Sequence, residues 1–368
     1  MAVLGPVRIL VVNAGSSSLK LRVLDADDDV AGGADLPAPL GLADMPAVEA
    51  AISGLPKAQA VGCRIVHGGT QYTAPVLVDQ QVQDRLKALT DLAPLHQPKS
   101  LSALRTVQAV LPSVPVVACF DTAFHASLPE AAATYALPPE WRKRWALRRY
   151  GFHGLSHSYC SRRAADLLGR PAGLRVVTCH LGAGASLAAV HDGRSVDTTM
   201  GFTPLDGLVM ATRSGAVDPG LMLWLEEHAG MPPAELAATL EHRSGLLGLA
   251  GTADMRDVLA RAAAGDHRAE LALGVFLHRL RGAIAAMAAA MGGLDGLVFT
   301  GGIGENSPQV RALAAEGLGF LGVSVDPERN SAGPADREIG RDGVAVRSLV
   351  IAAREDIEIA HQVRAVLG

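Results

Sequence analysis

Three short turns rich in glycine and serine interrupt apolar segments of this sequence. They lie in VVNAGSSSLK (11–20), CHLGAGAS (179–186) and FTGGIGENSP (299–308). Backbone N–H groups in such turns, and at the start of a following helix, bind anions. Three turns of this kind, each after an apolar segment, indicate a site for the phosphates of a nucleotide.

The segments on both sides of the first turn are predicted to be strands. Residues 9–12 are apolar, and LKLRVLD (19–25) alternates Leu and Val with Lys20 and Arg22, which is the period of a half-buried strand. The turn therefore joins two strands. This excludes the phosphate loop of nucleoside triphosphatases, because that loop has the pattern GxxxxGK[ST] and leads into a helix.

The same arrangement returns in the second half of the chain. LRVVTCHLGAGASLAAVHDGRSVD (174–197) contains an apolar segment, a glycine bend, a second apolar segment and an Asp-Gly hairpin turn. The third turn follows an apolar strand and leads into a helix with Ser307 as N-cap and Pro308 at its first position. The repetition predicts an internal duplication, with the nucleotide in a cleft between two related domains.

Length and composition agree with two domains. A chain of 368 residues is longer than a single hydrophobic core usually organises. Its composition, 49% hydrophobic and 19% charged residues, is that of an ordinary globular protein. A net charge of −4 argues against a nucleic-acid partner. One basic segment, WRKRWALRRYG (141–151), is interpreted as a helix with a buried stripe of Trp141 and Trp145 and a solvated basic face.

The cysteines favour a reduced, cytoplasmic protein. All four are scattered, without CxxC or zinc spacing, and three lie in apolar segments. The N-terminus lacks the pattern of a secretory signal, and the most apolar long segment, 270–291, contains His278, Arg279 and Arg281. We therefore expect no membrane segment.

Seven blocks together carry a family resemblance. VVNAGSSSLK, CRIVHGG, FDTAFH, YGFHGLSH, CHLGAGAS, MGFTPLDGLVMATRSGAVDPG and FTGGIGENSP occur in the order seen in the acetate/propionate kinase family of the actin and sugar-kinase-like ATPase superfamily. The resemblance implies an α/β fold of two duplicated actin-like (ribonuclease H-like) domains with a nucleotide cleft between them. It also implies a homodimer and reversible Mg²⁺-dependent transfer of a phosphoryl group between ATP and acetate, with acetyl phosphate and ADP as products.

The resemblance assigns catalytic roles to four residues. Arg64 and Arg213 resemble the pair that holds the acetate carboxylate and the transferring phosphoryl group, and Asp121 lies near them. A guanidinium fork suits this task because it can hold two oxygens at once. His153 is expected to donate to the phosphoryl group. His153 and His157 share the i,i+4 spacing of a zinc pair, but no HExxH motif accompanies them, so we predict no histidine metal site.

The remaining positions of the family pattern concern nucleotide, metal and acyl group. Mg²⁺, for which Mn²⁺ can substitute, is expected at Asn13 and Glu355. An apolar wall is expected to enclose the acyl group. One methylene changes the discrimination by such a pocket by only about 1–3 kcal/mol, so the sequence does not decide whether acetate or propionate is preferred. The wall residues are Val66, Leu95, Phe152 and Pro204, and the nucleotide contacts are Asn13, Ser16, Ser18, Lys20, His180, Gly182, Gly184, Asp254, Arg256, Gly302, Ile303, Gly304 and Asn306.

Departures from the family pattern affect the phosphate contacts, the acyl pocket and the metal neighbourhood. They are LHQPKS (95–100), Ala183 and AREDIE (353–358).

The expected domains are 1–149 with 354–368, and 150–353, because Glu355 must reach a metal held by the N-terminal half. The alternatives are a propionate or butyrate kinase, and a non-catalytic actin-like nucleotide-binding protein, which would have no need of the two arginines and His153.

Overall fold

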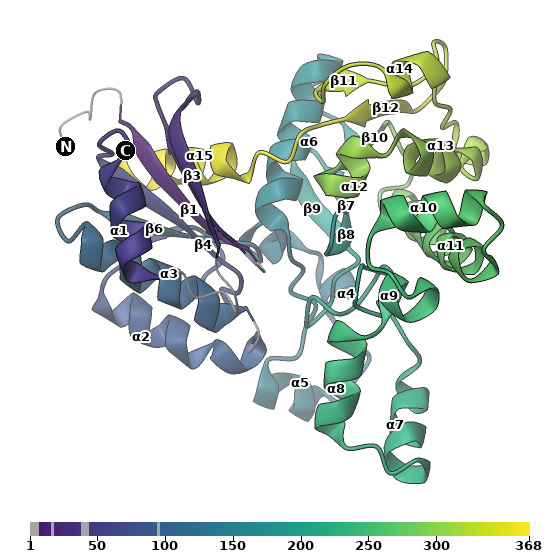
Figure 1. Cartoon of the computed structure of the whole chain (residues 1–368), viewed down its shortest axis with the longest axis horizontal. Helices are drawn as coiled ribbons and strands as arrows, with labels where there is room; N and C mark the ends of the chain where they lie inside the picture. Colours follow the sequence, from purple (N-terminus) through teal and green to yellow (C-terminus); the bar gives the residue numbers. More distant parts are fainter. Residues whose placement is uncertain (1–6, 16–17, 38–43, 94–95) are drawn as a thin grey trace. The chain divides into compact units, whose positions relative to one another are not determined.

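The chain forms two compact units in a computed structural model (Figure 1), which describes residues 7–15, 18–37, 44–93 and 96–368. Two predicted contacts, Ser16 and Leu95, lie outside the described residues. The expected domain boundaries stay a prediction. Unit 1 comprises residues within 1–126, 152–159 and 354–368, and unit 2 comprises residues 127–151 and 160–353.

Each unit contains one mixed six-stranded sheet, and both sheets have the same strand order. The order is β3-β2-β1-β4-β6-β5 in unit 1 and β9-β8-β7-β10-β12-β11 in unit 2. β1 pairs antiparallel with β2 and parallel with β4, just as β7 pairs antiparallel with β8 and parallel with β10. This identical topology confirms the predicted α/β fold with two related sheets.

The elements of unit 1 are β1 (Ile9–Ala14), β2 (Ser18–Leu24), β3 (Val30–Pro37), β4 (Ala60–Ile65), β5 (Val76–Leu77), β6 (Val116–Phe120), α1 (Met45–Ser53), α2 (Gln80–Ala88), α3 (Gln97–Val110) and α15 (Glu355–Leu367). Helix α6 (Gly154–Leu168) begins in unit 1 and continues in unit 2.

The elements of unit 2 are β7 (Arg175–Leu181), β8 (Ala185–His191), β9 (Arg194–Thr198), β10 (Gly296–Thr300), β11 (Arg337–Glu338), β12 (Arg347–Val350), α4 (Glu130–Ala133), α5 (Pro139–Trp145), α7 (Pro219–His228), α8 (Pro233–His242), α9 (Gly245–Ala250), α10 (Met255–Ala263), α11 (His267–Ala290), α12 (Gly301–Asn306), α13 (Pro308–Glu316) and α14 (Pro327–Ser331).

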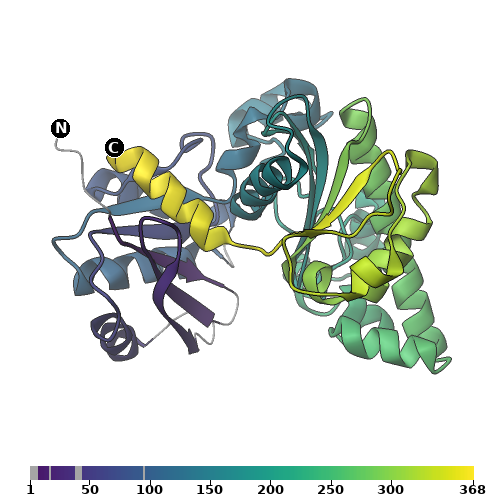
Figure 2. The same cartoon turned by 90° about the horizontal axis from the view of Figure 1, so that it is seen from above.

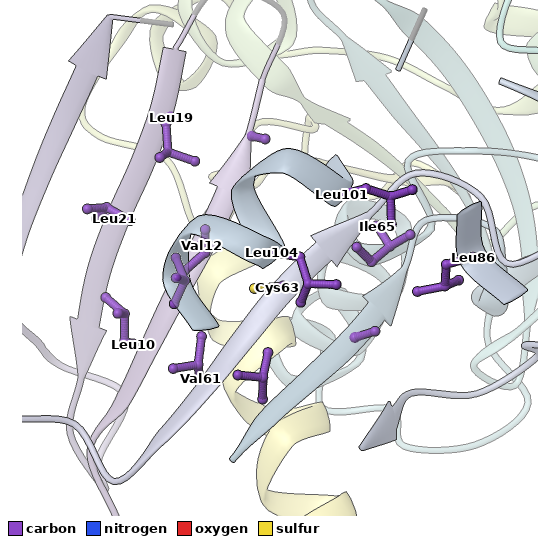
Figure 3. Packing of buried hydrophobic residues seen from close by; sticks show 14 of the residues in the cluster. Leu10, Val12, Leu19, Leu21, Val61, Cys63, Ile65, Leu86, Leu101 and Leu104 are labelled. Atoms are coloured by element: carbon purple, nitrogen blue, oxygen red, sulfur yellow. The ribbon is translucent and has the colours of Figure 1, made fainter. Parts of the chain in front are cut away.

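Alternation along the strands gives the sheet of unit 1 two buried faces. Leu10 and Val12 on one face pack with α1, α2 and α3. Figure 3 shows them in one cluster with Leu86 of α2 and with Leu101 and Leu104 of α3. Ile9 and Val11 on the other face pack with α15. Figure 2 shows α15, in yellow, lying against the strands of this unit. The C-terminal helix therefore belongs to the core of the unit that the N-terminus begins.

Gly62 in β4 makes room for α15. A Cβ atom at this position would lie 2.4 Å from Cγ2 of Ile359 and 2.8 Å from Cγ2 of Val363. Both side chains are fully buried against the sheet, and such burial contributes roughly 1.5–3 kcal/mol for each. The glycine at position 62 lets α15 approach the strands closely enough to bury the side chains of Ile359 and Val363.

Helix α11 packs on the sheet of unit 2. Among the described helices it has the length and composition of a membrane span. Its residues contact β7, β8 and β9, and Phe276, Leu280 and Ile284 are buried. The three arginines in its sequence, Arg268, Arg279 and Arg281, and this packing identify α11 as a core helix.

Local signals placed the turns correctly. Asp192 and Gly193 both have positive φ, 51° and 71°, as the predicted hairpin turn between β8 and β9 requires. Ser307 caps α13, where its side chain accepts a hydrogen bond from the N–H of Val310, and Pro308 is the first residue of the helix. The glycine-rich turn before them differs from the prediction, because residues 301–306 form the short helix α12.

The predicted buried stripe of Trp141 and Trp145 is wrong. Each side chain is 49% exposed, and α5 buries none of its residues. The helix has only seven residues. The two tryptophan rings pack edge to face on each other, with their centroids 6.1 Å apart, and the guanidinium of Arg144 lies 4.8 Å from the centre of the Trp145 ring. Helical spacing brought the two tryptophans together but provided no core to cover them.

Candidate active site

Three polar side chains lie at the carboxyl ends of adjacent parallel strands in unit 1. Asn13 is the fifth residue of β1, Arg64 the fifth of β4, and Asp121 follows the last residue of β6. All three continue the face that packs on α15, since each stands two positions beyond a residue of that face, namely Val11, Gly62 and Cys119. Parallel strands end at one edge of a sheet, which is where α/β proteins bind ligands.

Arg64 and Asp121 form the centre of this cluster. Nε and Nη2 of Arg64 both donate to the Asp121 carboxylate, at 3.0 and 2.6 Å, and Nη1 donates to Oδ1 of Asn13 at 3.2 Å. Asp121 is 1% exposed and Arg64 is 15% exposed. The two-pronged contact fixes the plane of the guanidinium, which a lysine could not do.

Glu355 joins the cluster from the first position of α15. Its Oε2 accepts a hydrogen bond from Nδ2 of Asn13 at 2.7 Å and lies 4.0 Å from Nε of Arg64. Glu355 is separated from Asn13 by most of the chain, and the packing of α15 on the sheet brings them together. An amide oxygen and two carboxylates thus surround one arginine.

The charges of the cluster depend on one another. Burial lowers the pKa of Arg64, but the carboxylates of Asp121 and Glu355 outweigh this effect and raise it. Burial raises the pKa of Asp121, and the neighbouring guanidinium opposes this. The bidentate ion pair is the reason that a carboxylate can be buried here.

His153 stands in a strained backbone segment beside Asp121. Its φ is +56°, a conformation that is uncommon for residues other than glycine. The residues on both sides are held: Nε2 of His125 bonds the carbonyl of Phe152 at 3.0 Å, and the N–H of Gly154 donates to the backbone carbonyl of Asp121 at 2.9 Å. These contacts place His153 next to the C-terminal end of β6.

Two buried histidines pack around Phe152. The rings of His67 and Phe152 meet edge to face at 5.6 Å, and His125 holds the carbonyl of the same residue. Burial lowers the pKa of each histidine to about 4. Both are therefore neutral near pH 7. Phe152 and Val66, two residues of the predicted acyl wall, are themselves buried in unit 1.

Arg213 belongs to unit 2 and has different partners. Its Nε lies 2.9 Å from Oε1 of Glu241, and Nη1 donates to the carbonyl of Pro204 at 3.0 Å. Pro204 is the wall residue that the sequence places on this half of the chain, so the structure brings one predicted arginine and one predicted wall residue together. Glu241 carried no signal in the sequence, because its surroundings are an ordinary helix end.

His180 lies near the end of β7, and Gly182 and Gly184 belong to the bend that joins β7 to β8. The N–H of Gly182 donates to the carbonyl of Gly184 at 3.0 Å, which closes the bend. His180 pairs in register with Thr300, the residue that precedes the turn of Gly302, Ile303, Gly304 and Asn306. Two of the three glycine-rich turns therefore meet at the same edge of the second sheet.

The other predicted nucleotide contacts are surface residues. Lys20 is exposed on β2, and Ser18 begins that strand. Asp254 is the N-cap of α10, where it accepts from the N–H of Arg256 and forms an ion pair with the same side chain at 2.6 Å. Arg256 is 89% exposed in that pair.

A cavity of about 660 Å³ lies elsewhere in unit 2. It is bordered by α13, by α14 and by residues 322–325 and 341–345, and none of the residues predicted from the sequence lines it. Its volume suits a small molecule. The cavity does not coincide with the predicted nucleotide contacts.

Two sheets of one strand order, with charged residues at the strand ends of one and glycine turns at the strand ends of the other, define an α/β protein with duplicated actin-like domains. A model of the acetokinase family matches residues 41–361. This chain therefore belongs to the acetokinase family. The match covers the cluster residues Arg64, Asp121 and Glu355, and family members are ATP-using kinases with a carboxylate as acceptor.

Named relatives agree with this membership. An acetate kinase from Leifsonia xyli subsp. xyli is 46% identical over 386 aligned positions, which cover 96% of this chain and 97% of that protein. The crystal structure of an acetate kinase from Porphyromonas gingivalis is similar with a TM-score of 0.88 at 34% identity, and that of a propionate kinase from Francisella tularensis with a TM-score of 0.90 at 36% identity. Each covers 98% of this chain and 100% of its own.

Proposed function

We propose that this chain catalyses reversible phosphoryl transfer from ATP to acetate, giving acetyl phosphate and ADP by direct in-line transfer. Family membership and the relatives named acetate kinase support the reaction. The observation that carries the residue assignment is the cluster of Asn13, Arg64, Asp121 and Glu355. In-line transfer needs positioned cations and donors and no covalent intermediate on the protein.

In this proposal the two arginines divide the work. Arg64 holds the acetate carboxylate, and Asp121 orients its guanidinium through the bidentate contact. Arg213 stabilises the charge that spreads over the phosphoryl oxygens during transfer. His153 donates to the same oxygens. The apolar wall of Val66, Leu95, Phe152 and Pro204 receives the methyl group.

The metal is proposed to be Mg²⁺, with Mn²⁺ as a substitute, held by Asn13 and Glu355. Both residues offer oxygen atoms, the ligands that Mg²⁺ prefers, and a 2.7 Å hydrogen bond places their side chains together. No group of three or more His, Cys, Asp or Glu residues able to hold an ion occurs in the described part of the chain. A site with few protein ligands is typical of Mg²⁺, because this ion keeps several bound waters and also binds substrate phosphates. When bound, the ion neutralises phosphate charge.

The nucleotide is proposed to bind through backbone donors more than through charged side chains. In this proposal the bend of unit 2 at 182–184 and the short helix at 301–306 offer N–H groups to the phosphates, with Ser18 and the undescribed Ser16 as further contacts. Lys20, Asp254 and Arg256 are surface residues of this proposed site.

Acyl specificity is tested with a hydroxamate assay. The protein is incubated with ATP, Mg²⁺ and formate, acetate, propionate or butyrate, and the acyl phosphate is trapped with hydroxylamine. We expect the largest kcat/KM for acetate. A protein without product for any carboxylate would overturn the proposed function, and Arg213→Ala serves as the control for background activity.

Propionate is the second candidate. The solved propionate kinase resembles this chain as closely as the solved acetate kinase does. One methylene changes binding in an apolar pocket by only about 1–3 kcal/mol, so related pockets can prefer either acid. A larger kcat/KM for propionate in the same assay would select this alternative.

We also propose a homodimer. Leu221, Leu223 and Trp224 on α7 are 46%, 58% and 53% exposed, which is an unusual concentration of apolar side chains on one surface helix. Light scattering after size exclusion is expected to show two chains per particle and Trp224→Asp to weaken the assembly. A monomer at all concentrations would contradict the proposal.

We place the protein in the cytoplasm. All four cysteines lie among the described residues, where they are buried and form no disulfide, and burial raises the pKa of the Cys63 thiol to about 12. Cysteines kept as thiols suit a reducing compartment.

A further inference from the structure

Glu305 in α12 makes a contact that none of the predicted roles includes. Its Oε1 accepts a hydrogen bond from the backbone N–H of Gly301 at 2.9 Å and another from the N–H of Ala353 at 3.0 Å. Ala353 is 48 positions from Glu305 in the sequence. One carboxylate oxygen thus joins the start of the glycine-rich turn to a distant segment of unit 2.

The first end of this connection is a tightly fixed turn. Gly301 has φ of +76°, and a Cβ there would lie 2.8 Å from the carbonyl of Leu181. The opposite end of α12 is held by Arg311, a 1% exposed residue that donates to the carbonyls of Gly304 and Glu305, each at 2.8 Å. Residues 301–306 are therefore held at both ends. The Glu305 side chain holds the N–H of Gly301 at the N-terminal end, and Arg311 holds two carbonyls at the C-terminal end.

The second end lies immediately before the proposed metal ligand. The chain leaves unit 2 after Ala353, enters unit 1 at Arg354, and begins α15 at Glu355. Asp336 accepts from the N–H of Ala352 at 3.1 Å. Two carboxylates thus hold the last residues of unit 2, and Glu305 is the one that also holds the glycine-rich turn.

We propose that Glu305 is a positioning residue that couples nucleotide binding at the glycine-rich turn to metal binding at Glu355. The proposal rests on the function proposed above. A movement of Gly301 on nucleotide binding displaces the oxygen that holds Ala353, and Ala353 stands two residues before Glu355. Such coupling is reciprocal, so the metal also favours the nucleotide-bound turn, and values near tenfold are usual for coupled sites.

The test compares three variants of Glu305 with a matched control. Glu305→Ala removes the acceptor, Glu305→Asp shortens its reach by one methylene, and Glu305→Gln keeps a carbonyl oxygen at the same distance. Glu316→Ala removes an exposed glutamate from the neighbouring helix α13. The readouts are KM for ATP and for acetate, ADP affinity by calorimetry, and Mn²⁺ affinity of the ADP-bound protein by electron paramagnetic resonance.

We expect Glu305→Ala and Glu305→Asp to weaken both ADP and Mn²⁺ binding about tenfold, with KM for acetate within twofold of the parent. Glu305→Gln and Glu316→Ala should match the parent protein. A variant that loses ADP affinity while Mn²⁺ affinity stays unchanged would overturn the coupling, as would a Gln variant that behaves like Ala. The affinity measurements need no turnover, so an inactive parent protein would refute the proposed function and leave this test intact. If Glu305→Ala melts below the assay temperature, Glu305→Asp supplies the result.

Discussion

The two units share one strand order and place different chemistry at the ends of corresponding strands. In unit 1, β1 and β4 carry Asn13 and Arg64 near their ends, and a carboxylate follows β6. In unit 2, β7 and β10 carry His180 and Thr300 in register, and glycine-rich turns follow. One copy of the sheet has charged side chains at these strand ends, and the other has glycine-rich segments there.

Under the proposed function, this difference divides one reaction between the two copies of the sheet. Charged side chains suit the carboxylate and the metal, which need strong, oriented point contacts. Backbone donors suit phosphates, which accept several hydrogen bonds around a compact group. The conserved topology supplies the same edge twice, and the residues after each strand decide what that edge binds.

The largest expected effect tests the arginine of unit 2. Arg213→Ala should lower kcat by ~10³ or more, the order seen when an arginine that stabilises a transferring phosphoryl group is removed. KM for ATP should change little, because backbone donors hold the nucleotide. Steady-state kinetics at saturating ATP and acetate measure this. Near-normal turnover would show that Arg213 serves its structural contacts with Glu241 and Pro204 and has no role in transfer.

The arginine of unit 1 should affect binding and stability together. Arg64→Ala should raise KM for acetate and lower kcat, since ground-state and transition-state binding are lost together. It also leaves Asp121 buried without its cation, which costs about 3–5 kcal/mol of unfolding free energy. Arg64→Lys should recover little activity, because a point charge cannot reproduce two prongs. Calorimetry of ADP binding provides the control, and equal losses of ADP affinity and activity would contradict the assignment.

A pair of glycine substitutions tests the packing of α15. Gly62→Ala should destabilise unit 1 by about 1–3 kcal/mol, because the stiff side chains of Ile359 and Val363 occupy the space that Cβ needs. Gly282→Ala in α11 has open space and should instead stabilise unit 2 by about 0.5–1 kcal/mol. Native-state hydrogen exchange reads the two units separately. A change of the same sign in both units would count against this difference in packing.

We also expect the stability of unit 1 to depend on pH. The folded-state pKa of His67 and of His125 is lowered to about 4, below the unfolded value of about 6.5, so the unfolded chain binds more protons between these values. Stability from each histidine is therefore complete above pH 6.5 and declines as pH falls toward 4, with a loss of about 2 kcal/mol at pH 5.

Hydrogen exchange of unit 1 at pH 7 and pH 5 measures this decline, and His125→Asn should reduce it by about half. The exposed His191 supplies a control, because His191→Asn removes a histidine of unit 2. Equal protection of unit 1 at both pH values would mean that neither buried histidine resists protonation.

Much of the fold could be predicted from local patterns. The alternation in LKLRVLD predicted the strand that the structure gives as Ser18–Leu24, and HDGR predicted the hairpin at Asp192 and Gly193. Ser307 and Pro308 predicted the start of α13. These signals depend on side-chain period, positive φ and capping, which act over a few residues and are readable from sequence.

The site was predictable only as separate residues. The family resemblance named Arg64, Asp121 and Glu355, and residue chemistry explained why an arginine suits a carboxylate. Their meeting depends on three parallel strands ending at one edge and on α15 packing over Gly62, both of which are long-range events. The roles of these residues stay predictions until the variants are measured.

The sequence by itself determined the strand and turn pattern, the duplication and the kinds of chemical group available. Tertiary structure alone decided that Trp141 and Trp145 face solvent, since helical spacing pairs two rings without providing a partner surface. It also decided that Glu305 reaches Ala353, because a hydrogen bond across 48 positions exists only once α12 and the segment before α15 lie against each other. Periodicity reports which residues of one element share a face, and only packing selects what that face meets.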